Sequence, residues 1–243
     1  LHSGRVQRVD QVLRQMDAAG VDRALLIPFP VVEDHRLAHD EIAAAVRAYP
    51  DRFAGAACLH PYLPRGWFFD ELRRCVEELG FRALKLQPQY HGFNPASEAS
   101  RFYFEAALHF SLVVICHTGA GAPFALPSLF MWPAREYPEL QLVLAHAGGG
   151  LYAAEALVAA SFCPNIYIEL SWATPHQLRE IVRAIPASRL MIGSDVPENL
   201  EAEISKILRA PLPEESKRQI LWDTPRQLFD GVPEMESRET PAR

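Results

Sequence analysis

At residues 112–119 the sequence reads Leu112-Val113-Val114-Ile115-Cys116-His117-Thr118-Gly119, an apolar run that ends in a histidine and a small-residue turn. The same order recurs in Leu140-Gln141-Leu142-Val143-Leu144-Ala145-His146-Ala147-Gly148. A third run, Arg189-Leu190-Met191-Ile192-Gly193-Ser194, ends in Asp195. Short apolar runs bounded by turn residues are typical of the buried strands of a parallel sheet. Three polar side chains are therefore predicted at the carboxyl ends of three strands.

Strands and helices alternate along the chain. Seven strands are predicted, and they end near Pro28, His60, Gln87, His117, His146, Ser171 and Asp195. Apolar residues at helical spacing predict helices over residues 6–19, 39–49, 68–79, 97–110, 128–137, 151–162, 175–185 and 200–229, the last with a break near Pro211 and Pro213. This alternation predicts βαβ units and a parallel sheet.

The predicted fold class is α/β, a (β/α)8 TIM-type barrel that is incomplete at its start. Such a barrel has eight strands, whereas the chain opens with a helix where the first strand should come. We expect this strand to be missing or truncated, upstream of Leu1, with one barrel domain over residues 1–233 and a charged tail at 234–243. An open doubly wound sheet is the alternative. It requires a glycine-rich phosphate loop after the first strand, and Gly148-Gly149-Gly150 comes late and lacks the GxGxxG spacing.

Composition narrows the class of protein further. The net charge is −6, from 24 basic and 30 acidic residues, and neither sign forms a long block, which argues against a nucleic-acid surface. No stretch approaches the roughly 18 apolar residues of a membrane helix. The four cysteines form no CxxC pair, so a thiolate zinc site or a disulfide framework is not indicated. We expect a cytoplasmic protein that acts on a small-molecule substrate.

The three strand-end side chains have the chemistry of a metal site. Imidazoles and a carboxylate on neighbouring strand ends can converge on one divalent cation, and zinc accepts nitrogen and oxygen ligands. Such an ion lowers the pKa of a bound water toward about 7. A single strand-end histidine could equally be structural. Burying His117, His146 and Asp195 together without a shared purpose would cost a few kcal/mol for each group.

Three strings of this sequence resemble a known family. Ile115-Cys116-His117-Thr118-Gly119, Leu144-Ala145-His146-Ala147-Gly148-Gly149 and Ile192-Gly193-Ser194-Asp195-Val196-Pro197 are similar to the strand-five, strand-six and strand-eight motifs of the amidohydrolase-related metal-dependent hydrolases, the group that includes aminocarboxymuconate-semialdehyde decarboxylase. The resemblance implies that His117 is a metal ligand and that His146 polarises the substrate or moves a proton. It implies that Asp195 is a metal ligand and the general base for the attacking water.

One departure from the family concerns its first strand, which carries an HxH pair that supplies two metal ligands. No HxH occurs in these 243 residues. His2 is either the second histidine of that pair, and so a third metal ligand beside His117 and Asp195, or a terminal residue without a role. If the chain is complete, the metal site has lost a ligand, and a degenerate, noncatalytic barrel becomes an alternative of another class.

The sequence thus favours a metal-dependent hydrolase with one divalent ion, expected to be Zn²⁺, and with His146 and Asp195 as catalytic residues. A non-oxidative decarboxylase on the same site is the runner-up. Lys85, expected to be unmodified, and Glu169 and Trp172, near the ends of strands, are lower-ranked pocket candidates. Aromatic residues at helical spacing indicate core packing or the contact of a homodimer, and they are Trp67, Phe68, Phe69, Phe102, Tyr103 and Phe104.

Overall fold

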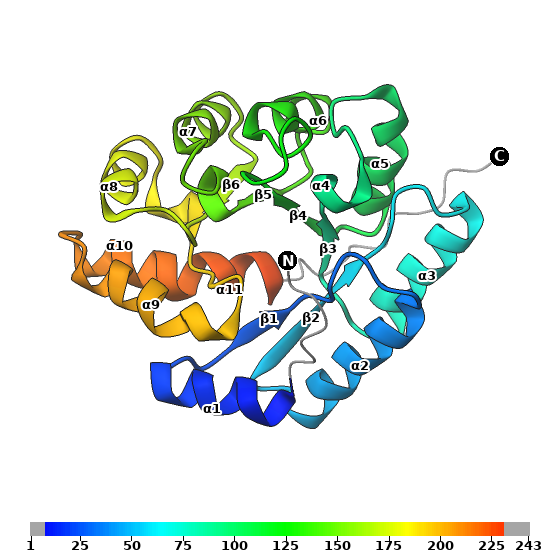
Figure 1. The fold of residues 1–243 in the computed structure, drawn as a ribbon, viewed down its shortest axis with the longest axis horizontal. Helices are drawn as coiled ribbons and strands as arrows, with labels where there is room; N and C mark the ends of the chain where they lie inside the picture. The colour runs from blue at the N-terminus through cyan, green and yellow to red at the C-terminus, as the bar shows by residue number, and fades with distance from the viewer. Residues whose placement is uncertain (1–7, 231–243) are drawn as a thin grey trace.

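The structure is a computed structural model that describes residues 8–230, and its centre is one parallel sheet whose strands follow chain order. The strands are β1 (Ala24–Leu26), β2 (Phe53–Cys58), β3 (Ala83–Leu86), β4 (Val113–His117), β5 (Leu142–Ala145), β6 (Ile166–Glu169) and β7 (Leu190–Met191). Each of the seven pairs in parallel with the next. The sheet curls, with helices around its outside (Figure 1). The seven predicted strands and the incomplete barrel are confirmed.

The helices lie where the apolar spacing predicts them, with small shifts at their ends. They are α1 (Val9–Ala19), α2 (His35–Ala48), α3 (Arg65–Glu77), α4 (Pro88–His91), α5 (Arg101–His109), α6 (Met131–Glu136), α7 (Ala153–Phe162), α8 (Pro175–Ala184), α9 (Leu200–Arg209), α10 (Glu214–Arg218) and α11 (Thr224–Phe229). A π-helical turn, η6 (Gln219–Asp223), joins α10 to α11. The short helix α4 was not predicted. It begins at Pro88, whose fixed φ suits the first helical position.

Alternation along the strands divides the side chains into two layers. Residues that face outward pack under the helices in the larger apolar cluster, which includes Leu84, Val114 and Leu144. Residues that face inward form a second cluster inside the barrel, made of Ala56, Ala83, Val113, Ile115, Val143, Ala145 and Met191 together with Leu228 and Phe229 of α11. Small residues on β2 and β3 leave room for these two helical side chains.

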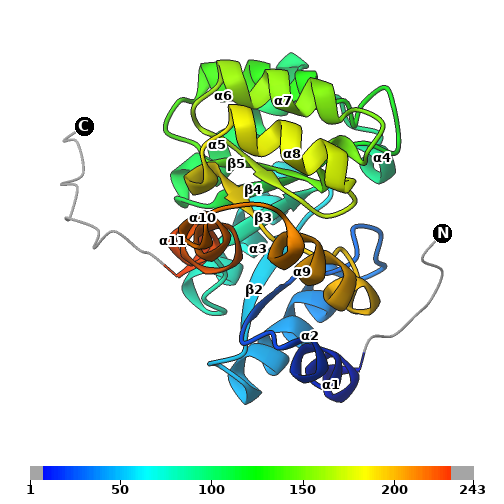
Figure 2. The same cartoon turned by 90° about the vertical axis from the view of Figure 1, so that its left-hand side faces the viewer.

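The C-terminal helices cover the side of the barrel where β1 and β7 do not pair with each other. In the ring of helices, α9 and α10 lie between α8 and α1 (Figures 1 and 2). The Ile192 N–H, just after β7, donates to the Ile220 carbonyl in η6 at 3.1 Å. Arg23, just before β1, forms an ion pair with Asp230 after α11. The segment from α9 to α11 therefore ties the two sheet edges together.

The aromatic residues on α3 and α5 belong to the core. Phe68, Tyr103 and Phe104 are fully buried, and Trp67, Phe69 and Phe102 pack against the same cluster. The prediction of core packing is therefore confirmed. These residues no longer give a reason to expect a homodimer contact on α3 and α5. A homodimer stays a prediction.

Two compositional expectations concern membranes and disulfides. None of the helices in the described part of the chain is long and apolar enough to cross a membrane. All four cysteines are buried with free thiols, as their spacing predicted. The predicted tail at 234–243 lies outside the described residues, and the assignment of one domain to 1–233 stays a prediction.

The packing of α11 inside the barrel makes Leu228 a sensitive position. Its side chain is 4% exposed, whereas that of Leu208 on α9 is 52% exposed. Leu228→Ala should lower the free energy of unfolding by about 2–5 kcal/mol through the lost burial and the cavity left behind. The matched variant Leu208→Ala should change it by less than about 0.5 kcal/mol. Urea unfolding of both variants checks this, and equal losses would contradict the position given to α11.

Candidate functional site

The three strand-end residues lie close together at the carboxyl ends of the strands. His117 is the last residue of β4 and pairs in register with Ala145, which directly precedes His146. The imidazole centroids of His117 and His146 are 5.0 Å apart. His146 Nε2 lies 3.7 Å from Oδ1 of Asp195, which follows β7. Side chains separated by up to 78 residues in the sequence, 195 − 117, therefore share one small region.

The backbone is strained where the strands give way to loops. His146, Trp172 and Asp195 have φ values of 71°, 62° and 64°, in the left-handed region that side-chain-bearing residues rarely adopt. Each such residue costs on the order of 1–3 kcal/mol and persists only when the surrounding contacts fix it. All three lie at the ends of β5, β6 and β7, which is where strain is expected if the turn must direct a side chain into a site.

Glu169, the last residue of β6, organises the surroundings of His146. Its buried carboxylate accepts hydrogen bonds from the His146 N–H at 2.9 Å, the Ser171 N–H at 2.6 Å and the Ser171 hydroxyl at 2.9 Å. Burial raises the pKa of Glu169, and these hydrogen bonds oppose the shift. The carboxylate thus holds the turn after β5 and the turn after β6 in one arrangement.

Ser171 determines which nitrogen of His146 carries the proton. Since its hydroxyl donates to Glu169, the same oxygen accepts from His146 Nδ1–H at 2.8 Å. Burial keeps the pKa of His146 well below its ordinary value, so the ring is neutral and its Nε2 bears a lone pair. That lone pair faces the carboxylate of Asp195 at 3.7 Å. Two acceptors thus face each other.

The hydrogen bonds that His117 and Trp172 donate determine which acceptor atoms remain on His117 and on Asp195. His117 Nε2–H donates to the Ala120 carbonyl at 2.8 Å, which leaves Nδ1 as an acceptor. Trp172 Nε1–H donates to Asp195 Oδ2 at 3.1 Å and leaves Oδ1 toward His146. Imidazole nitrogens and a carboxylate oxygen are ligand types that suit a divalent cation. The residues present therefore fit the metal that the sequence predicts, and their individual roles stay predictions.

The donor set is open rather than closed. Ligand atoms of His117, His146 and Asp195 do not all lie within 4.8 Å of one another, and within residues 8–230 only His39, Glu71 and Cys75 form such a group. Ligands about 2 Å from one ion lie about 3–4 Å apart, so His117 would have to move toward the other two. His2, the remaining predicted ligand, lies outside the described residues.

The His39, Glu71 and Cys75 group has the features of a structural network. His39 Nδ1 lies 2.8 Å from Glu71 Oε1, and its Nε2 accepts from the Cys58 N–H at 3.1 Å. Burial alone would raise the pKa of Glu71, but hydrogen bonds from His39 and Arg74 lower it to about 2. Both imidazole nitrogens and both carboxylate oxygens are already used. This network links α2 and α3 to β2, and no motif in the sequence pointed to it.

His91 lies in the short helix α4 after β3, and the structure buries it. Its side chain is 3% exposed in α4, and Nε2–H donates to the Pro30 carbonyl at 3.2 Å. The ring lies beside that of His60, tilted by 53° at a centroid distance of 4.8 Å. Burial lowers the pKa of His91 to about 4. The unpredicted helix α4 is the reason, because it turns this residue inward.

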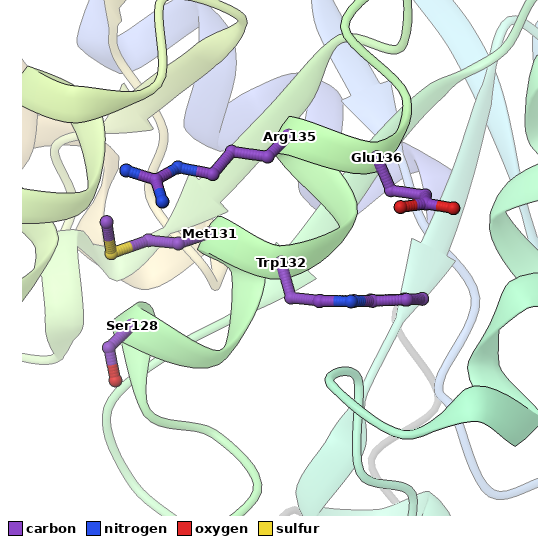
Figure 3. Close-up of a pocket in the computed structure, with 5 residues that line it drawn as sticks. All are labelled: Ser128, Met131, Trp132, Arg135 and Glu136. Atoms are coloured by element: carbon purple, nitrogen blue, oxygen red, sulfur yellow. The ribbon is translucent and has the colours of Figure 1, made fainter.

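A shallow hollow on the outer face of the protein is separate from this site. Figure 3 shows its lining side chains on α6 and the turn before it, and they are Ser128, Met131, Trp132, Arg135 and Glu136. Arg101 stacks on Trp132 and pairs with Glu136. None of these residues belongs to a strand end, so we do not assign the chemistry to this hollow.

The comparison with known proteins identifies the family. The amidohydrolase family model matches residues 3–231, so the chain belongs to the amidohydrolase family. A relative is the gamma-resorcylate decarboxylase of Polaromonas sp. strain JS666, which is 25% identical over 90% of this chain and 86% of its own. The two sequences align over nearly their whole lengths.

Several solved structures with the same fold are decarboxylases, whereas the 4-oxalomesaconate hydratase of Rhodopseudomonas palustris also matches, with a TM-score of 0.74 and 20% identity over 91% of this chain and 80% of its own. The 5-carboxyvanillate decarboxylase of Sphingomonas paucimobilis matches with a TM-score of 0.76 and 18% identity over 93% of this chain and 84% of its own. A dihydroxybenzoic acid decarboxylase of Polaromonas sp. JS666, with bound manganese and 2-nitroresorcinol, matches with a TM-score of 0.75 and 20% identity over 93% and 86%. At these identities the likeness establishes the fold.

The contact between Gly193 and Glu169 gives a test of the network. A Cβ on Gly193 would lie 2.5 Å from Glu169 Oε1 and 2.6 Å from its Cδ, so the buried carboxylate would have to move. Gly193→Ala should lower the free energy of unfolding by about 1–3 kcal/mol. Gly66→Ala, where a Cβ meets nothing within 4 Å, serves as the control and should be neutral or stabilising. Equal stability of both variants in urea unfolding would contradict the role given to Glu169.

The burial of His91 predicts a loss of stability in acid. Its pKa is about 4 in the folded protein and about 6.5 when unfolded, so the unfolded chain binds more protons as the pH falls through this window. Stability should therefore decrease from pH 6.5 toward pH 4, by up to about 2 kcal/mol for His91 between pH 7 and about pH 5. Urea unfolding of His91→Gln should show a smaller decrease. The exposed His176→Gln should keep the wild-type slope, and an unchanged slope in His91→Gln would refute the assignment.

Proposed function

We propose that the protein is a metal-dependent, non-oxidative decarboxylase of a small aromatic carboxylate. The observation that carries the proposal is the facing pair of His146 Nε2 and Asp195 Oδ1, 3.7 Å apart at the rim of the barrel. The decarboxylases named above, which match nearly the whole chain, support this reading over the hydrolysis that the sequence favoured. Family membership keeps hydrolysis on the same site as the second candidate.

His117 and Asp195 would hold one divalent ion, with His2 as a further candidate ligand. When bound, the ion orients the substrate and stabilises negative charge on its oxygens. The sequence indicated zinc, whereas a relative of the same fold contains manganese. Nitrogen and carboxylate ligands suit both metals, so we propose Mn²⁺ or Zn²⁺ at this position.

The protein's own residues supply the proton that decarboxylation requires. The bond between the ring carbon and the carboxylate breaks, its electron pair stays on the carbon, and carbon dioxide leaves. A proton that water has delivered between His146 Nε2 and Asp195 Oδ1, two acceptors 3.7 Å apart, is then transferred to that carbon. Water returns a proton to the pair. Ser171 and Glu169 keep Nδ1 protonated, so that Nε2 is the nitrogen that exchanges protons.

Product analysis on a panel of hydroxybenzoates tests the proposal. We expect release of carbon dioxide that is abolished by a chelator and restored by Mn²⁺ or Zn²⁺. Asp195→Asn and His146→Asn should each lower kcat by about 10²–10⁴-fold, the usual contribution of a positioned acid or base. His176→Gln, an exposed histidine, is the control and should keep wild-type activity.

Three outcomes would contradict the proposal. Full activity after chelation, or in Asp195→Asn, would show that the reaction does not depend on the proposed metal site. Products formed by addition of water would establish hydrolysis instead. Absence of metal binding together with absence of turnover would favour the degenerate, noncatalytic barrel.

A cytoplasmic location stays a prediction that fractionation of cells can test.

A further inference from the structure

Lys85 has a position unlike that of any other lysine in this protein. The chain has three lysines, at 85, 206 and 217, among 24 basic residues. Lys206 pairs with Glu203 and donates to the Leu170 carbonyl, and Lys217 pairs with Glu214 at 2.8 Å. Lys85 lies on β3, pairs in register with Ile115 of β4, and shares a face of the strand with the inward-facing Ala83, two residues before it. Its side chain therefore points into the barrel.

The charge of Lys85 has no partner in the part of the chain that the structure describes. The residue is 8% exposed, and within residues 8–230 its ammonium takes part in no ion pair or hydrogen bond. Burial lowers the pKa of Lys85, while neighbouring groups that include Asp195 and Glu169 oppose the shift. These two carboxylates lie near enough to be felt electrostatically but beyond the distance of an ion pair. A buried ammonium without a counter-ion is costly.

The neighbouring carboxylates are already engaged elsewhere. Glu169 accepts three hydrogen bonds from His146 and Ser171. Asp195 accepts from Trp172 Nε1 and faces His146. Lys85 pairs in register with Ile115, two residues before His117 on β4, so the side chains of Lys85 and His117 lie on the same inward face of the sheet. The charge of Lys85 also lowers the pKa of His117 and of His146, which agrees with an ammonium near the strand-end site. A ligand between them would meet a cation on β3 and the lone pairs of the site on the other side.

We propose that the Lys85 ammonium binds a carboxylate group of the ligand inside the barrel, opposite His146 and Asp195. The inference deepens the proposed function, since it assigns the subsite that receives the anionic group of the substrate. A carboxylate there forms the ion pair that residues 8–230 do not supply. The backbone of Lys85 is held from outside the sheet, because the Tyr103 hydroxyl donates to its carbonyl at 2.7 Å. The cation is thus presented from a rigid strand.

Binding of benzoate and of its neutral isostere benzamide tests the proposal directly. Dissociation constants are measured by calorimetry on the full chain with Mn²⁺, for the wild type, Lys85→Met, Lys85→Arg and the surface control Lys217→Met. We expect the wild type and Lys217→Met to prefer benzoate by about 10-fold or more, the usual scale of a charge-assisted contact. Lys85→Met should lose this preference while it binds benzamide as before. Lys85→Arg, which keeps the charge, should retain a preference for benzoate.

Thermal unfolding separates this role from a structural one. Because Lys85→Met removes a buried charge that has no partner among the described residues, it should leave the melting temperature unchanged or raise it. The inference is overturned if Lys85→Met binds benzoate as well as the wild type does, or if the wild type shows no preference for benzoate. It is also overturned if Lys85→Met melts several degrees lower, since the protein would then compensate the charge itself.

The carboxylate subsite at Lys85 and the proposed decarboxylation can be accepted or rejected separately. Lys85-dependent benzoate binding without any decarboxylation would retain the subsite and reject the reaction. Decarboxylation with unaltered benzoate binding in Lys85→Met would retain the reaction and reject the subsite.

Discussion

The parallel register of the strands is the constraint on which the rest of the structure depends. Since all seven strands run the same way in chain order, their carboxyl ends form one rim, and any polar residue that follows a strand is brought to it. His117, His146 and Asp195 meet for this reason alone. The sheet edges at β1 and β7 are tied by η6, α11 and the Arg23–Asp230 ion pair instead of by a further strand within the described residues. Cohesion at this side therefore comes from the C-terminal helices.

The energetically unfavourable features of the structure lie close together at the rim of the barrel. Several groups at the rim are each unfavourable on their own. They are the positive φ values at His146, Trp172 and Asp195, the buried carboxylate of Glu169, and the Lys85 ammonium, which has no ion-pair partner within residues 8–230. Glu169 offsets part of this cost by accepting from two strand-end turns at once. So many unfavourable groups in one place support the proposal that the rim holds charge and lone pairs ready for a ligand.

Much of the fold and part of the site could be predicted from the sequence. The apolar runs before His117, His146 and Asp195 predicted their strands, because short buried strands of a parallel sheet are almost continuously apolar. Their convergence then followed from the fold. The partnership of Ser171 with Glu169, the burial of His91 by α4 and the His39–Glu71 network could not be predicted, because each depends on tertiary contacts between distant elements. The choice between hydrolysis and decarboxylation was equally out of reach, since one donor set serves both.

The account rests on a single divalent ion held at the ends of β4 and β7. Anomalous diffraction at the manganese edge, from crystals grown with Mn²⁺, tests it most directly. We predict one strong peak about 2 Å from a His117 nitrogen and from an Asp195 carboxylate oxygen, with His146 beside it. A peak between His39, Glu71 and Cys75, or no peak near Asp195, would contradict the account.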